Sequence, residues 1–155
     1  MGYAIYDSSF GKIKIGFTDQ AITMLHLVAI TENVDVGVPS KLSDLAFLQL
    51  TEYFLGKRKA FAFPIEMQGT DFQKKVWQAL CDIPYGETRS YQEIAIAIGN
   101  PKACRAVGMA NNKNPIAIAV PCHRVIGANG SLVGYAGGLP MKTALLELEK
   151  KNKNV

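Results

Sequence analysis

The sequence has few of the residues that build disulfide frameworks and metal sites. Its 155 residues include only two histidines and three cysteines, Cys81, Cys104 and Cys122. An odd number of widely spaced cysteines argues against a disulfide framework and favours reduced thiols. The same few residues form no recognisable zinc pattern, so we expect no metal.

Long hydrophobic runs are also missing, although 48% of the residues are hydrophobic. No run approaches the roughly 20 apolar residues that a membrane span needs. The N-terminal segment lacks the basic start and the long apolar stretch of a secretory signal. We therefore expect a cytoplasmic protein without a membrane segment, large enough for one domain or for two small lobes.

An excess of positive charge is absent from the first part of the chain. Residues 1–66 carry six Lys/Arg and seven Asp/Glu, a net charge of −1, whereas residues 67–155 carry eleven and six, a net charge of +5. The positive charge of residues 67–155 suits a polyanionic partner such as a nucleic acid. Ordinary solubilising charge would give the same pattern.

The N-terminal part has the pattern of a small αβ lobe. Alternating apolar and polar residues predict an antiparallel meander of strands at 3–7, 11–17 and 21–28. A helix is expected to begin at Ser40 or Ser43 and to end at Gly56, and residues 61–65 are expected to add a strand. The predicted apolar face of the helix consists of Leu45, Phe47, Leu48, Tyr53 and Leu55. No motif in this lobe indicates chemistry.

Helices dominate the prediction for residues 67–155. Capping-box patterns at Thr70-Asp71-Phe72-Gln73 and Ser90-Tyr91-Gln92-Glu93 predict two helix starts. The second helix ends at Gly99, and Asn100-Pro101 predicts the start of another. Two helices joined by so tight a turn indicate a helix-turn-helix. The predicted fold class is therefore α+β, with an N-terminal αβ lobe at 1–66 and a mostly helical lobe at 67–155.

The second helix of the helix-turn-helix divides into two stripes. One consists of small residues suited to close packing, Ala103, Ala106, Val107 and Ala110. The other, at the same spacing, consists of Arg105, Gly108, Met109 and Asn112. A glycine in mid-helix costs about 1 kcal/mol relative to alanine, and close approach by a partner would compensate for it. Spacing alone leaves two interpretations open, a DNA contact and an ordinary exposed face.

A thiol and an imidazole follow an apolar run at 116–120, which predicts a buried strand. With a pKa near 8.5, only about 3% of a free cysteine is thiolate at pH 7. His123 adjoins Cys122, but neighbours on an extended strand point to opposite faces, so contact needs a bend or a bridging water. The final helix, predicted to begin at Pro140, brings Glu149 to the border of its buried face. Glu149 is thus a candidate to orient the imidazole in a Cys–His–Glu relay.

These motifs resemble those of the O6-alkylguanine-DNA alkyltransferases. The resemblance covers roughly residues 67–150 and rests on Pro121-Cys122-His123-Arg124-Val125, Ser90-Tyr91, Arg105-Ala106-Val107-Gly108, Asn114-Pro115 and Tyr135-Ala136-Gly137-Gly138-Leu139. It implies that Cys122 irreversibly accepts the alkyl group of O6-alkylguanine in duplex DNA, once per molecule. The base must first be flipped out, because the alkyl carbon is otherwise inside the stack.

The resemblance also implies a role for each site residue. His123, acting through a water and supported by Glu149, takes the thiol proton, and Tyr91 donates a proton toward the leaving guanine. Arg105 enters the duplex where the nucleotide has left. Gly108 suits the close approach of a minor groove, Asn114 is implied to brace the site, Asn114 and Arg124 are further expected DNA contacts, and a base pocket is implied for Val125, Tyr135 and Ala136. Residues 109–113 depart from the family pattern, so DNA contacts by Met109 and Asn112 are expected from the exposed stripe alone. The resemblance implies neither a cofactor nor a metal. The expected partner is double-stranded DNA containing O6-alkylguanine, bound by a monomer, with O4-alkylthymine left open.

Three other functions remain open at this point. A non-repairing sensor of alkylguanine would replace the acceptor cysteine, yet Cys122 is present. A helix-turn-helix regulator with a redox-sensing cysteine would normally carry a ligand or dimerisation domain, which residues 1–66 do not evidently provide. A thiol hydrolase using Cys122, His123 and Glu149 would turn over peptides or esters and show no preference for alkylated DNA.

Overall fold

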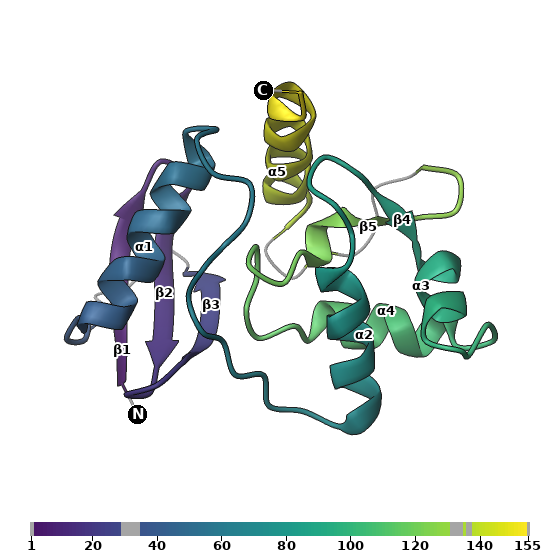
Figure 1. The fold of residues 1–155 in the computed structure, drawn as a ribbon, viewed down its shortest axis with the longest axis horizontal. Helices are drawn as coiled ribbons and strands as arrows, with labels where there is room; N and C mark the ends of the chain where they lie inside the picture. The colour runs from purple at the N-terminus through teal and green to yellow at the C-terminus, as the bar shows by residue number, and fades with distance from the viewer. Residues whose placement is uncertain (1, 29–34, 131–134, 136–137, 155) are drawn as a thin grey trace. The chain divides into compact units, whose positions relative to one another are not determined.

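The computed structural model of the chain describes residues 2–28, 35–130, 135 and 138–154. Two compact units make up the chain, Met1–Met67 and Gln68–Val155. Figure 1 shows a three-stranded sheet with one helix in the first unit and a mainly helical second unit. The predicted α+β fold class is confirmed. None of the helices described is long and apolar enough to cross a membrane.

The sheet of the first unit is an antiparallel meander of β1 (Gly2–Ser8), β2 (Gly11–Phe17) and β3 (Ile22–Leu27) in that order. Alternation in β2 buries Ile13 and Ile15 under α1 (Lys41–Phe54), which packs against all three strands. Ser40 caps α1 through a reciprocal capping box with Ser43. The three strands and the start of α1 thus lie where the sequence predicts them.

Two expectations for the first unit were wrong. Leu48 and Leu55 are 56% and 63% exposed, whereas the buried face of α1 includes Ala46 and Leu50, which were not predicted, together with Tyr53, which was. The prediction followed the leucines and so misplaced part of the buried face. The stripe that faces the sheet begins at the small residue Ala46 and continues at i+4 and i+7. Residues 61–65 form no strand beyond a single bridge from Ile65 to Ile22. The backbone N–H of Ala62 donates instead to the buried Gln49 side chain, at 2.8 Å.

The second unit contains α2 (Asp71–Cys81), α3 (Tyr91–Ala97), α4 (Cys104–Asn112) and α5 (Leu139–Asn152). Both predicted capping boxes are present, Thr70 with Gln73 at α2 and Ser90 with Glu93 at α3. Trp77 on α2 is 1% exposed, and its indole N–H donates to the Ala110 carbonyl on α4 at 2.9 Å. This buried hydrogen bond fixes α2 against α4.

The helix-turn-helix is formed by α3 and α4, but α4 begins three residues later than Asn100-Pro101 predicts. Asn100 and Ala103 close a turn instead, with the Ala103 N–H 3.0 Å from the Asn100 carbonyl. The Gln92 side-chain amide binds the Pro101 carbonyl at 2.8 Å and so fixes this turn from α3. On α4, Val107 and Ala110 are buried as predicted, whereas Ala106 is exposed.

The predicted strand at 116–120 is also wrong, because the run curls into tight turns. The Asn114 side chain accepts from the Ile116 N–H at 3.0 Å and donates to the Val120 carbonyl at 2.8 Å. Ile118, at the apex, has a φ of 71°, a conformation that costs a β-branched residue about 1–3 kcal/mol. Burial of Ile118 to 3% exposure offsets part of that cost.

Candidate active site

Cys122, His123 and Arg124 form a single 3-10 turn rather than the end of a strand. The Cys122 N–H donates to the Val120 carbonyl at 2.8 Å, and the Arg124 N–H donates to the Pro121 carbonyl at 3.0 Å. The turn supplies the bend that contact between neighbouring side chains requires. All three side chains are buried, with Cys122 5% and His123 0% exposed.

The imidazole of His123 is held by a carboxylate from α5. Its Nε2 lies 2.6 Å from Oε2 of Glu149, which is 1% exposed. Burial is the main cause that lowers the pKa of His123, although the Glu149 charge opposes it. The imidazole is therefore neutral, and a neutral ring that donates from Nε2 keeps Nδ1 as an acceptor. Nδ1 is buried and has no hydrogen-bond partner among the described residues.

Arg124 does not lie where the expected DNA contact would place it, because its guanidinium is buried and bound within the protein. Arg124 is 7% exposed. Its Nε lies 2.8 Å from Oε1 of Glu149, its Nη2 lies 3.0 Å from Oε2, and its Nη1 donates to the Ile83 carbonyl at 2.7 Å. This two-point ion pair and the His123 bond hold the pKa of Glu149 down at about 2, against the effect of burial. Arg124 is thus a buried support of the relay and is not available as a DNA contact.

The thiol of Cys122 needs help to ionise. Burial raises its pKa, whereas the Asn114 side chain, the Lys142 charge and the backbone N–H groups of Cys122 and His123 act in the opposite direction. Burial disfavours the charged form because a thiolate loses its hydration in the interior. A base within reach is therefore required before the sulfur can act as a nucleophile.

A two-residue parallel pairing holds Tyr91 near this turn. Arg89 and Ser90 of β4 (Arg89–Ser90) pair with Val125 and Ile126 of β5 (Val125–Ile126), and Tyr91 is the first residue of α3. Burial and the charge of Cys122 raise the pKa of Tyr91, so its phenol stays protonated at neutral pH.

Tyr135 is a second phenol close to the sulfur. Its pKa is raised by burial, and also by the charge of Cys122 and a hydrogen bond with it. Val125 is fully buried and directly follows the turn. Ala136, the remaining residue expected in the base pocket, lies outside the described residues.

Two asparagines brace the turn from α4 and its C-terminal extension. Asn114 binds the protein through both amide atoms, Oδ1 to the Ile116 N–H and Nδ2 to the Val120 carbonyl, which is consistent with a bracing role, and its contact with DNA stays a prediction. Asn111 is 2% exposed, and its amide donates to the Cys122 carbonyl at 3.3 Å. Sequence reasoning missed Asn111, which lies one turn after Val107 on the buried side of α4.

The other residues expected to contact DNA lie on the outer side of α4. Arg105 and Asn112 are exposed, and Met109 is 62% exposed. Gly108 is half-buried, and a Cβ placed there would lie 3.8 Å from the Tyr91 ring, an ordinary contact distance. Packing inside the unit therefore does not require glycine at this position.

Lys142 is the charged residue that the sequence prediction missed. It is 0% exposed on α5, and its Nζ donates to the Val125 carbonyl at 2.6 Å. Helical spacing could have revealed it, because Lys142, Leu145 and Glu149 recur at i, i+3 and i+7. The described residues contain no cluster of three His, Cys, Asp or Glu side chains that could hold a metal ion.

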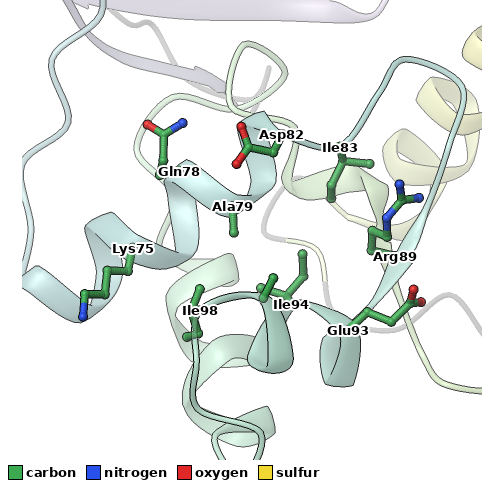
Figure 2. A pocket seen from close by; sticks show the side chains of 10 residues that line it. Lys75, Gln78, Ala79, Asp82, Ile83, Arg89, Glu93, Ile94 and Ile98 are labelled. Carbon is green, nitrogen blue, oxygen red and sulfur yellow. The ribbon is translucent and has the colours of Figure 1, made fainter.

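A separate groove of about 460 Å³ lies between α2 and α3. Figure 2 shows the lining side chains, which include the apolar Ile83 and Ile94 and the charged Lys75, Asp82, Arg89 and Glu93. Cys122, His123 and Glu149 do not line it. The groove is therefore distinct from the thiol site.

Fold and site together define a protein with a helix-turn-helix and a buried cysteine beside a His–Glu pair, as expected of a DNA-acting protein with a cysteine nucleophile. Residues 1–67 match the ribonuclease-like domain of 6-O-methylguanine DNA methyltransferase, and residues 71–151 match its DNA binding domain. The chain belongs to the 6-O-methylguanine DNA methyltransferase family. Its function is DNA repair by transfer of an alkyl group to a cysteine of the protein itself.

Individual relatives agree over nearly the whole chain. The chain is 47% identical to the methylated-DNA–protein-cysteine methyltransferase of Methanosarcina barkeri, with 98% of this chain and 99% of the relative covered. It is 50% identical to that of Mycobacterium leprae, with 93% and 89% covered. The structure is similar to Mycobacterium tuberculosis OGT in complex with DNA, with a TM-score of 0.88, 49% identity, and 97% and 93% covered. These similarities do not favour a regulator or a non-repairing sensor.

Proposed function

We propose that Cys122 is the acceptor of the alkyl group and that His123 and Glu149 activate it. The observation that carries the proposal is the 2.6 Å bond between His123 Nε2 and Glu149 in a turn that begins at Cys122. That bond leaves Nδ1 as the basic atom of a neutral imidazole. The thiol proton passes to Nδ1 through a bridging water, and the imidazolium is stabilised by the Glu149 carboxylate.

Transfer follows as an in-line displacement at the alkyl carbon. The thiolate sulfur of Cys122 forms a bond to that carbon while the bond from carbon to guanine O6 breaks and its electron pair passes to the base. Tyr91 donates its phenol proton to the base, and the proton held by His123 returns to the phenolate through solvent. The products are an S-alkyl cysteine and guanine. A thioether is stable in water, so each molecule acts once.

We infer that the partner is double-stranded DNA with an O6-alkylguanine, bound by one protein monomer through the outer side of α4. Arg105 would occupy the space that the flipped nucleotide leaves, with Met109 and Asn112 against the duplex and Gly108 allowing close approach. Backbone groups of the Cys122 turn would hold the base. Residues 67–155 would thus carry the chemistry, and residues 1–66 would support them.

The protein is expected to take up label from duplex DNA carrying a labelled O6-methylguanine until about one label is bound per molecule, because the acceptor is not regenerated. Peptide mapping of the labelled protein should place the group on Cys122. A Cys81→Ser/Cys104→Ser double variant, which keeps the proposed acceptor, is the control and should reach the same plateau. Sustained turnover, or label on another residue, would contradict the proposal.

Replacing Arg105 with alanine is expected to slow repair of duplex DNA about tenfold, because the variant no longer offsets part of the few kcal/mol that vacating the base stack costs. Reaction with free O6-methylguanine base should change little, since no stack has to be opened. Rates of label transfer from the two substrates measure the difference. Lys113→Ala, which removes an exposed cation just after α4, controls for charge. Equal losses on both substrates would argue against a flipping role for Arg105.

A further inference from the structure

Helix α5 contacts the cysteine turn at two points with groups of opposite charge. Glu149 binds His123 and Arg124, whereas Lys142 binds the carbonyl of Val125, the residue that directly follows the turn. Lys142 and Glu149 are seven positions apart in the sequence, so the two lie on one face of α5 about 10.5 Å apart along its axis. The turn that carries the sulfur is therefore held between a buried cation and a buried anion.

We propose that Lys142 is a positioning residue whose ammonium favours the thiolate of Cys122 and fixes the Val125 carbonyl. The inference rests on the proposed role of Cys122 as the acceptor. Burying an ammonium costs several kcal/mol unless it binds partners, and the hydrogen bond to the Val125 carbonyl does not in itself require a charged donor. A cation at this point gains most from a nearby group that becomes negative during the reaction.

Electrostatic coupling between the two groups supports this role. The Lys142 charge acts to lower the pKa of Cys122, and the Cys122 charge acts to raise that of Lys142, although burial opposes both changes. Lys142 also acts to lower the pKa of His123 and so favours its neutral, basic form. Within the described part of the chain, the other titratable or charged groups coupled to Cys122 or His123 include Tyr91, Arg124, Tyr135 and Glu149.

The test is the pH dependence of Cys122 alkylation by iodoacetamide, followed by mass spectrometry of the peptide that contains Cys122. In Lys142→Met, which keeps the length of the side chain, the midpoint should rise by about one pH unit, as expected from the loss of a nearby opposite charge. Transfer of label from O6-methylguanine DNA should then fall about tenfold below both midpoints and converge with the wild-type rate above them. A structural defect would lower the rate equally at every pH.

Two further variants keep the result interpretable. Lys151→Met removes an exposed lysine from the same helix and should leave the midpoint unchanged. Lys142→Gln keeps a donor without the charge, so it should shift the midpoint like the methionine variant and replaces that variant if methionine prevents folding. An unchanged midpoint in folded Lys142→Met or Lys142→Gln, or a loss of rate independent of pH, would overturn the inference. Failure of the proposed function is distinguishable, because DNA-derived label would then appear on a residue other than Cys122.

Discussion

Replacing Cys122 with serine is expected to reduce alkyl transfer from O6-methylguanine DNA by at least about 10³-fold, as removal of an enzyme nucleophile does. A serine hydroxyl is close in size to the thiol but is a weak nucleophile without strong activation. The neutral His123 has a lowered pKa and can deprotonate a hydroxyl only poorly. The measurement is label bound to protein against time, with DNA in excess.

Stability and DNA binding of the Cys122→Ser variant should change little. The sulfur is 5% exposed and the hydroxyl fits the same space, so the thermal unfolding midpoint reports whether the fold is kept. DNA affinity of the variant should match that of the wild type, since the outer side of α4 is untouched. Residual transfer at more than about one hundredth of the wild-type rate would mean that Cys122 is not the acceptor.

Replacing Glu149 with glutamine is expected to lower the free energy of unfolding by about 3–5 kcal/mol. The change leaves the Arg124 guanidinium buried without its anion, and removal of one partner from a buried ion pair costs that much. Glu149 also accepts from the Gly86 N–H at 3.1 Å, so the change perturbs the segment after α2 as well. Denaturant unfolding measures the loss.

A double variant separates the buried charge from simple loss of packing. Arg124→Met/Glu149→Gln should be less destabilised than Glu149→Gln alone, because no unpaired charge remains in the interior. Glu147→Gln, at an exposed position of the same helix, is the matched control and should stay within about 0.5 kcal/mol of the wild type. If the two single losses simply add in the double variant, the ion pair does not hold the turn.

The Glu149 carboxylate makes the free energy of unfolding decrease at acidic pH. The pKa of Glu149 is lowered from 4.5 to about 2, so the folded state binds its proton less readily than the unfolded state. Its contribution is complete above pH 4.5 and is lost as the pH falls toward 2. His123, buried and with a pKa below 6.5, destabilises the fold in the same direction once the pH drops under 6.5. In Glu149→Gln, unfolding free energy should vary less with pH between about 4.5 and 2.

Local sequence signals determined much of the second unit. Capping boxes at Thr70 and Ser90 fix helix starts because a side chain and a backbone N–H three residues apart satisfy each other without tertiary help. The same local chemistry indicated the helix-turn-helix. The resemblance around Cys122 likewise identified a thiol, an imidazole and the distant Glu149 as candidates, and the structure brings His123 and Glu149 together.

Tertiary contacts decided what these local signals could not. The run at 116–120 has the composition of a strand. Two hydrogen bonds of the Asn114 side chain, one donated and one accepted, instead hold the run in tight turns, and Cys122 begins the turn that follows. Arginine is a residue type expected at a DNA contact. The Arg124 guanidinium is nevertheless bound in the interior by Glu149 and the Ile83 carbonyl, which lie 25 and 41 residues away in the sequence. Lysine side chains are usually exposed, but Lys142 is buried and binds the Val125 carbonyl beside the turn.

The division has a physical reason. A helix cap or a stripe at helical spacing involves residues within one or two turns, so the sequence alone specifies it. Whether a charged side chain is solvated or paired depends on partners brought close by folding, and burial then changes both its pKa and its function. The sequence by itself thus determined the family and most of the helices, and it predicts Cys122 as the nucleophile. Only the tertiary structure decided that the cysteine lies in a turn held between Lys142 and Glu149, because that environment is assembled from α5 and from segments distant in the chain.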